Sequence, residues 1–161
     1  MTERNMLQDR LYLRHASMKD AGLLYGWRNE YECRKNSVNT DYIEYKSHCK
    51  WLSDRLNSAC TSIFICMREN GGGHEPIGQV RIDYGMDRDG EISYSIAEGY
   101  RCNGYGTRML GMLESMEEVK KNAGRLCAII KIDNSASQKC FEKLGYLKSI
   151  KEDMVHYVKN I

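Results

Sequence analysis

The sequence predicts an α/β (α+β) fold, with a mixed, mostly antiparallel sheet of about seven strands and helices on both faces. Its 161 residues suit one domain with a sizeable core, so we assign residues 1–161 to a single unit. Short segments that alternate between apolar and polar residues are typical of strands, and longer segments of helical periodicity separate them. Residues 126–132 are almost all apolar, as expected of a central strand that is covered on both faces.

The first half of the chain predicts a strand, two helices and then three strands. Ser17 is a candidate cap for the first helix. Gly71–Gly73 is interpreted as a hairpin loop, and Asp89–Gly90 as a turn. The expected elements are a strand at 11–14, helices at 20–29 and 43–56, and strands at 61–67, 77–84 and 91–96.

The second half predicts two helices and three strands. Residues 107–121 form a helix whose apolar stripe contains Met109, Leu113 and Met116. A second helix at 135–144 ends at Gly145, a residue type that favours the position just after a helix. The strands are expected at 126–132, 147–150 and 155–159.

Composition excludes several classes of protein. The 24 basic and 22 acidic side chains nearly cancel, which argues against a protein that binds nucleic acid mainly through phosphates. The 7 cysteines include no C-x-x-C pair, so we expect reduced, mostly buried thiols rather than a disulfide framework or a zinc site. No apolar run approaches membrane-spanning length, and the first 30 residues show no signal-peptide core. We therefore expect a cytoplasmic protein without a metal, either a monomer or a homodimer.

A loop of exposed backbone amides is predicted just before the helix at 107–121. Arg101-x-x-Gly104-x-Gly106 follows a strand there and leads into the helix. The first N–H groups of a helix have no internal partner and the helix dipole favours negative charge, so such a loop binds anions. The spacing differs from the G-x-G-x-x-G of dinucleotide folds and from the loop of nucleotide triphosphatases. A plain turn with a helix cap is the alternative.

This loop resembles the R/Q-x-x-G-x-G/A motif of the GNAT acetyltransferase superfamily. The segment from Asn134 to Tyr146 is similar to the family's N-x-x-A/S-x-x-x-Y-E-K-x-G-F motif, and the order of elements resembles that of the family over almost the whole chain. The resemblance implies the GNAT acyl-CoA N-acyltransferase fold, acetyl-CoA as cosubstrate, and a loop that holds its pyrophosphate. The cofactor-binding residues that it implies are Ser95, Ile96, Arg101, Cys102, Asn103, Gly104, Tyr105, Gly106, Thr107, Asn134, Ser137, Phe141 and Lys143.

The chain departs from the family at Phe141, where many members carry a tyrosine that protonates the leaving coenzyme A thiolate. Because a free thiol has a pKa of about 8.5, a thiolate is stable enough near neutral pH to leave without that acid. We therefore expect Phe141 to lie against the coenzyme A arm and to take no part in proton transfer. Packing of the ring in the core is the alternative.

Acetyl transfer to an amine needs a neutral amine, a polarised thioester carbonyl and alignment of the two. The resemblance implies that backbone N–H groups of the strand before the loop polarise the carbonyl. Glu91, Ser93 and Ser95 alternate onto one face of that strand, and a polar face inside a sheet is expected to line a wet cleft. Glu91 is the candidate base, with a surface carboxylate as the alternative, and His48 is a second candidate because of its ordinary pKa. Tyr94 is either a proton relay or a core aromatic.

The helices near the N-terminus indicate the acceptor. Trp27-Arg28-Asn29 precedes His48 and Trp51, which share one helix side that is offset from the apolar stripe. Arginine pairs with phosphate and indole stacks on a base or sugar, so this group suits an anionic, ring-bearing ligand. The alternative places the tryptophans in the core and the arginines in solvent.

The pattern resembles one subgroup of the family, the acetyltransferases that act on nucleotide-linked 4-amino sugars in pseudaminic acid biosynthesis. That resemblance implies a small-molecule acceptor, a UDP-linked amino sugar. Two other functions stay open, a protein N-terminal acetyltransferase of the ribosomal-protein type and a non-catalytic acyl-CoA-binding module. The expected acceptor-binding residues are Trp27, Arg28, Asn29, Arg34, His48, Trp51, Gln79 and Arg81.

Overall fold

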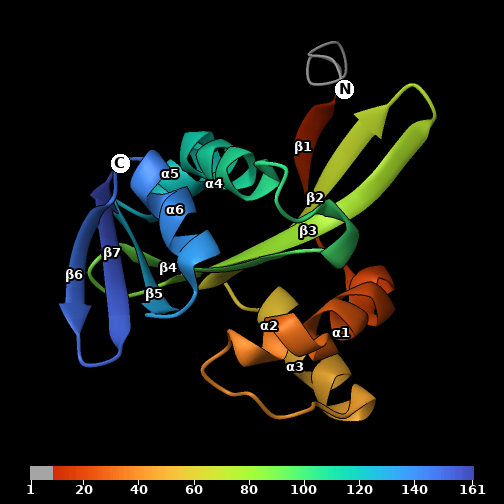
Figure 1. Cartoon of the computed structure of the whole chain (residues 1–161). Coiled ribbons are helices and arrows are strands. Elements are labelled where there is room, and N and C mark those ends of the chain that lie inside the picture. The colour runs from red at the N-terminus through yellow and green to blue at the C-terminus, as the bar shows by residue number, and fades with distance from the viewer. Residues whose placement is uncertain (1–8) are drawn as a thin grey trace.

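The computed structural model describes residues 9–161, which fold around one seven-stranded sheet (Figure 1). The strand order is β1-β2-β3-β4-β5-β7-β6, and every neighbouring pair is antiparallel except β4 and β5. The predicted mixed, mostly antiparallel sheet is therefore confirmed. The strands are β1 (Arg10–His15), β2 (Thr61–Asn70), β3 (Gly73–Tyr84), β4 (Asp89–Ile96), β5 (Arg125–Lys131), β6 (Leu147–Lys151) and β7 (Met154–Asn160).

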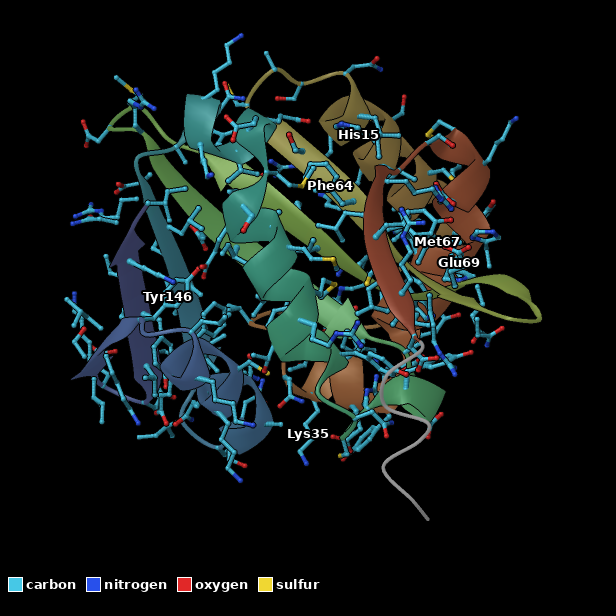
Figure 2. The ribbon with its side chains drawn as sticks, turned by 90° about the horizontal axis from the view of Figure 1, so that it is seen from above. His15, Lys35, Phe64, Met67, Glu69 and Tyr146 are labelled. Atoms are coloured by element: carbon cyan, nitrogen blue, oxygen red, sulfur yellow. The ribbon has the colours of Figure 1, made fainter. Side chains whose placement is uncertain are left out.

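Helices lie on both faces of the sheet (Figure 1). One group is α1 (Ala21–Asn29), α2 (Tyr31–Lys35) and α3 (Tyr45–Leu56), and the other is α4 (Tyr105–Ser115), α5 (Glu117–Asn122) and α6 (Ser135–Lys143). Seen from above, α4 crosses in front of the sheet beside α6 (Figure 2). The sequence predicts no element at residues 31–35, so α2 is a finding of the structure.

Each face of the sheet has its own core, because successive side chains of a strand point to opposite faces. In β2, Ile63 and Ile65 pack with Leu24, Trp27 and Leu52 of α1 and α3. The alternate residues Phe64 and Cys66 join the larger core beneath α4 and α6. Residues of the central strands that face α1–α3 therefore form a different surface from those that face α4–α6.

Local capping signals in the sequence are confirmed. The Ser17 hydroxyl accepts from the Lys19 N–H at 3.3 Å, and the Asp20 carboxylate accepts from the Ser17 N–H at 2.9 Å. This capping box closes a 3₁₀ turn at Met18–Asp20 that leads into α1. Gly145 follows α6 with φ 81°, the left-handed conformation that glycine adopts without strain.

The helix expected over 107–121 is two helices. Met116 has an extended backbone, with ψ 128°, between α4 and α5. Glu117 and Glu118 then occupy the first turn of α5, where acidic side chains are favoured by the helix dipole. The break also directs Val119 into the core, where it is fully buried.

The turn expected at Asp89–Gly90 lies earlier, between Gly85 and Arg88. Gly90 is inside β4, and a Cβ on it would lie 2.6 Å from Ile82 Cδ1 and 3.0 Å from Leu126 Cδ2. The glycine at this position is therefore explained by close packing across the sheet rather than by a turn.

All seven cysteines are free thiols in the structure. Only Cys66 is buried, while Cys60 and Cys102 are exposed, so the expectation of mostly buried thiols is wrong for these two. Between residues 9 and 161, none of the helices has the length and apolar character needed to cross a bilayer.

Candidate active site at the fork between β4 and β5

The sheet divides between its two parallel strands. β4 and β5 pair only at Asp89, Gly90 and Glu91, so the rest of β4 has β3 alone as its partner in the part of the chain that the structure describes. The Ala97 N–H bonds the Ile77 carbonyl on the β3 side. Because backbone groups alternate between the two edges of a strand, the N–H groups of residues 94 and 96 face the open side. We call this split the fork.

The loop at the end of β4 turns sharply into α4. Cys102 has φ 62° and Gly104, at the start of α4, has φ 77°. The first bond within α4 runs from the Arg108 N–H to the Gly104 carbonyl, which leaves the N–H groups of residues 105–107 without a helical acceptor. Asn103 shapes the loop by donating its side-chain amide to the Arg101 carbonyl at 2.9 Å. The backbone amides that the sequence predicts are thus exposed at the fork.

Several side chains of this loop point away from the exposed amides. Tyr105 is buried and donates its hydroxyl to Asp9 at 2.6 Å. A Cβ on Gly106 would lie 3.3 Å from Cys140 Sγ and 3.4 Å from Tyr94 Cε2, so this glycine lets α4 approach α6 and β4. Thr107 is half-buried in the first turn of α4.

The Arg101 side chain bonds two other parts of the chain. Its Nε donates to the Ile96 carbonyl at 2.9 Å, and its Nη2 bonds Glu30 at 2.6 Å. The guanidinium therefore joins the end of β4 to the junction of α1 and α2. Arg101 contributes its backbone to the loop, while its side chain contacts the other helical group.

The second motif starts at the opposite arm of the fork. Asn134 caps α6 by accepting from the Ser137 N–H at 3.3 Å, and the Ser137 hydroxyl donates to the Tyr94 hydroxyl at 3.0 Å. Burial is the main cause that raises the pKa of Tyr94, followed by the neighbouring Cys140. A phenol with a raised pKa is a poor acid at neutral pH, so the geometry favours the core-aromatic alternative for Tyr94 over a proton relay.

Phe141 lies in an aromatic cluster. Its side chain is fully buried, stacked on Tyr157 with ring centroids 5.3 Å apart and edge-on to Tyr146 at 4.9 Å. A direct contact with a coenzyme A arm would require this cluster to open, so the structure favours core packing for the ring. Lys143, two residues further along α6, is exposed.

A polar surface covers β3 and β4 on the side of α1–α3. It includes Gln79, which donates to Ser95 at 3.2 Å, and Arg81, which donates to Asp83 at 2.9 Å. Glu91 is exposed on this surface, opposite Asp83 on β3 and Cys127 on β5. It stands where the fork begins, so a base there lies one residue from the unpaired part of β4.

Trp51 of α3 borders the same surface. Its ring lies 5.3 Å from the Arg81 guanidinium and 6.0 Å from that of Arg55, and Arg55 also bonds Asp83 at 3.2 Å. Sequence reasoning missed Arg55, although it follows Trp51 by four residues and therefore shares its helix side. This aromatic and basic surface is built from α3 and β3 together.

Other residues that the sequence predicts as acceptor-binding instead hold the N-terminal helices together. Trp27 is buried in the core. The Asn29 side chain bonds both the N–H and the carbonyl of Ile43 at 2.9 Å, and Arg28 Nη2 donates to the Asn39 carbonyl at 2.7 Å. These contacts fix the connection between α2 and α3 at Asn39 and Ile43.

His48 is also buried, with 4% of its surface exposed, between the rings of Tyr25 and Trp51. Burial is the largest cause that lowers the pKa of His48, and the nearby Arg28 charge lowers it further. This enclosure favours a structural role for His48 over the predicted contact with a nucleotide or sugar, which stays a prediction. The same burial disfavours His48 as the base.

Three nitrogens of this helical group lack partners. Arg28 Nη1, Arg34 Nε and His48 Nε2 are buried and have no hydrogen-bond partner within residues 9–161. Arg34 also lies 5.9 Å from the Tyr42 ring, which holds its guanidinium beside the connection between α2 and α3. Buried polar groups are normally satisfied, so these unpaired nitrogens are exceptions to the packing of this region.

The split sheet and the amide loop at the fork define a transferase of the acyl-coenzyme A class. The model of the acetyltransferase (GNAT) domain family matches residues 10–147, and the chain belongs to that family. It is therefore an acetyl-CoA-dependent N-acetyltransferase, with acetyl-CoA as the cosubstrate. No sequence among curated proteins matches the chain.

Solved structures share the whole fold. A spermidine N-acetyltransferase from Vibrio cholerae, in complex with coenzyme A and spermine, has a TM-score of 0.80 at 13% identity and covers 93% of this chain and 95% of its own. RimL, a ribosomal L7/L12 alpha-N-protein acetyltransferase in complex with coenzyme A, has a TM-score of 0.80 at 14% identity, with 94% of each chain covered. An aminoglycoside acetyltransferase in complex with coenzyme A has a TM-score of 0.76 at 19% identity and covers 94% and 95%. At these identities the likeness concerns the fold, and the acceptors of these three proteins differ from one another.

Proposed function

We propose that this N-acetyltransferase acts on the amine of a nucleotide-linked amino sugar, by direct attack in a ternary complex. The observation that carries the proposal is the basic and aromatic surface beside the fork, where Trp51 lies against Arg81 and Arg55 on the face that presents Glu91. Arginine recognises phosphate by charge-assisted hydrogen bonds, and an indole stacks on a planar base or a sugar face. An anionic acceptor that contains rings matches both features.

The unpaired nitrogens of Arg28 and Arg34 support the same ligand class. Arg28 uses Nη2 to bond the Asn39 carbonyl and leaves Nη1 buried without a partner among the described residues. A phosphate oxygen is a hydrogen-bond acceptor of the kind that both guanidinium groups lack. A polycationic acceptor would instead place its charges against these arginines.

The residues at the fork account for the chemical step. In the proposed reaction the acceptor nitrogen attacks the thioester carbonyl carbon, a C–N bond forms and the C–S bond breaks. Backbone N–H groups on the open side of β4 stabilise the charge that develops on the carbonyl oxygen. Glu91 accepts the proton that the nitrogen loses, directly or through one water, and the sulfur leaves as a thiolate that takes a proton from solvent.

A thiol-release assay tests the acceptor class. The wild-type enzyme is given acetyl-CoA with a UDP-linked amino sugar, the matched free amino sugar, a peptide with a free N-terminus, or no acceptor. We expect the highest kcat/KM with the nucleotide-linked sugar. A peptide preference would indicate the ribosomal-protein type of enzyme, and thiol release with no acceptor at all would contradict the proposal.

The Arg28→Ala variant sharpens that test. A charge-assisted contact between arginine and phosphate is worth about 1.5–3 kcal/mol, which corresponds to roughly ten- to a hundredfold in affinity. We expect KM for the nucleotide-linked sugar to rise by about that factor, while KM for acetyl-CoA and for the free sugar changes little. Arg10→Ala, on the exposed start of β1, is the matched control. An equal rise in KM for both sugars would show that Arg28 only holds the connection between α2 and α3 in place.

A further inference from the structure

Helix α2 has no fully buried side chain, and each of its two ends contacts one arm of the fork. It contains five residues, none of them buried. Isolated helices shorter than about 12 residues are marginal in water, and this one has no buried apolar face to stabilise it. Its position in the structure must therefore depend on the contacts at its termini.

The N-terminal contact joins α2 to the arm of the fork that carries the loop. Glu30, just before α2, bonds Arg101 Nη2 at 2.6 Å, and both side chains are less than one-third exposed. Arg101 at the same time donates its Nε to the carbonyl of Ile96, the last residue of β4. One guanidinium therefore connects the end of β4, the amide loop and the start of α2.

The C-terminal contact joins α2 to the other arm. The ammonium of Lys131, the last residue of β5, donates to the carbonyl of Lys35 at 2.9 Å. Lys35, labelled in Figure 2, borders the remaining opening, a cavity of about 250 Å³ between α2 and the start of α6. In Figure 1, α2 lies under the part of the sheet where β4 and β5 separate.

We propose that α2 is a strap across the fork, and that Arg101 and Lys131 are positioning residues that couple coenzyme A binding to the acceptor-binding helices. A ligand that orders the amide loop fixes the backbone of Arg101, and through Glu30 it fixes the junction of α1 and α2. That junction leads into the connection that Arg28 and Asn29 hold. Coupling of this kind is reciprocal, so an ordered strap also strengthens coenzyme A binding.

The proposal concerns the cofactor loop and holds for any amine acceptor. Hydrogen exchange on the whole protein, with and without coenzyme A, therefore tests it with no acceptor present. In the wild type we expect coenzyme A to slow amide exchange in residues 31–44 by at least about fivefold, the lower end of typical coupling between sites. Failure of the nucleotide-sugar assay would leave this expectation unchanged.

Two variants identify the contacts responsible. In Glu30→Gln we expect coenzyme A affinity, measured by calorimetry, to fall only about two- to fivefold, the range for a partly exposed ion pair. The protection of residues 31–44 by coenzyme A should be lost in Glu30→Gln and reduced in Lys131→Met, which keeps the apolar stem of the side chain. Glu69→Gln on β2, which removes an exposed ion pair with Arg10 of β1, is the matched control and should keep full protection.

Three results would overturn the proposal. They are a wild-type protein that does not bind coenzyme A, a strap whose exchange does not respond to coenzyme A, and equal protection in wild type and Glu30→Gln. Circular dichroism of each variant shows whether it is folded. If Glu30→Gln is unfolded, Lys131→Met alone decides between the outcomes.

Discussion

The amide loop before α4 and the helices α1–α3 face the same fork, but they are built on opposite principles. The loop presents backbone N–H groups, whereas side chains such as Tyr105 turn away from it. In the helices the polar side chains hold the fold together, as Asn29 does by bonding both backbone groups of Ile43. A backbone site depends on the local path of the chain, while a side-chain site depends on packing between distant segments.

This difference predicts how each region responds to substitution. In the loop, a change in backbone conformation should weaken coenzyme A binding and leave the fold intact. In α1–α3, loss of a polar side chain should affect stability at least as much as binding, because the same atoms connect elements of structure. Glu91 lies between the two regions, on the strand that carries the loop and on the surface that faces α3.

The largest expected effect is on Glu91. Glu91→Gln keeps the shape of the side chain and removes its ability to accept a proton, and loss of a general base typically lowers the rate by about 10²–10⁴. Because Glu91 is exposed, we expect the fold and the affinity for coenzyme A to be unchanged. Steady-state kinetics across pH measure the effect, and Glu117→Gln, whose side chain is 93% exposed on α5, is the control.

An unchanged kcat at every pH would show that Glu91 is a surface carboxylate. Since burial disfavours His48 as the base, a route through bulk solvent would then be preferred. That outcome would also mean that catalysis depends on the backbone N–H groups of β4 and not on a side chain of the polar surface.

The next effect concerns the loop itself. Gly104 has φ 77°, and the left-handed conformation costs about 1–2 kcal/mol for a residue that carries a Cβ. Apart from its neighbours in the chain and the backbone of its own helix, no atom of residues 9–161 lies within 4 Å of the position where a Cβ would be, so the fold can accept a side chain there. We expect Gly104→Val to lower the affinity for coenzyme A, measured by calorimetry, by more than about tenfold. The altered backbone would no longer direct its N–H groups toward the pyrophosphate.

Gly99→Ala is the matched control. Gly99 also has open space around its Cβ position, it lies in the turn just before the loop, and its φ is not in the left-handed range. The affinity of Gly99→Ala for coenzyme A should stay within about twofold of the wild-type value, since a small change at an exposed site moves free energies by about 0.5 kcal/mol or less. Equal affinity in Gly104→Val and wild type would contradict a backbone site.

The same division explains what could be predicted from the sequence. Ser17, Gly104 and Gly145 act within a few residues of themselves, through caps and left-handed turns, so local patterns were sufficient to predict their roles. The ion pair between Glu30 and Arg101 joins positions 71 residues apart, and no local pattern indicates it.

Predictions from residue type failed where packing decides the surroundings. His48 and Trp27 have the chemistry of ligand contacts, but both are buried, His48 between the rings of Tyr25 and Trp51 and Trp27 in the core. Met116 continues an apolar stripe that predicts one helix. In the structure the helix is interrupted at Met116, and α5 then buries Val119 in the core. The fold class and the loop were therefore predictable, while the place of Arg55 beside Trp51 and Arg81 required the structure.

The smallest effect, and the most direct test of the helical region, is the pH dependence that His48 confers on stability. Its pKa in the folded protein is lowered, first by burial and then by the Arg28 charge. The folded state therefore binds a proton more weakly than the unfolded state, whose histidine has an ordinary pKa of about 6.5. The stability from neutral His48 is fully present above that value and is lost as pH falls from it through the folded-state pKa.

His48→Phe removes this titration while it keeps an aromatic ring between Tyr25 and Trp51. We expect the wild type to lose more thermal stability than His48→Phe between pH 7.5 and 5.5, and a difference of about 1 kcal/mol is measurable as about 2–4 °C in Tm for a domain of this size. His74→Phe, at an exposed histidine in the β2–β3 hairpin, should keep the wild-type pH dependence. A contrary result is a His48→Phe variant that keeps the wild-type pH dependence and raises KM for a nucleotide-linked acceptor alone. That result would show that His48 contacts the ligand. The contrast between a backbone site and helices held together by side chains would then fail at this residue.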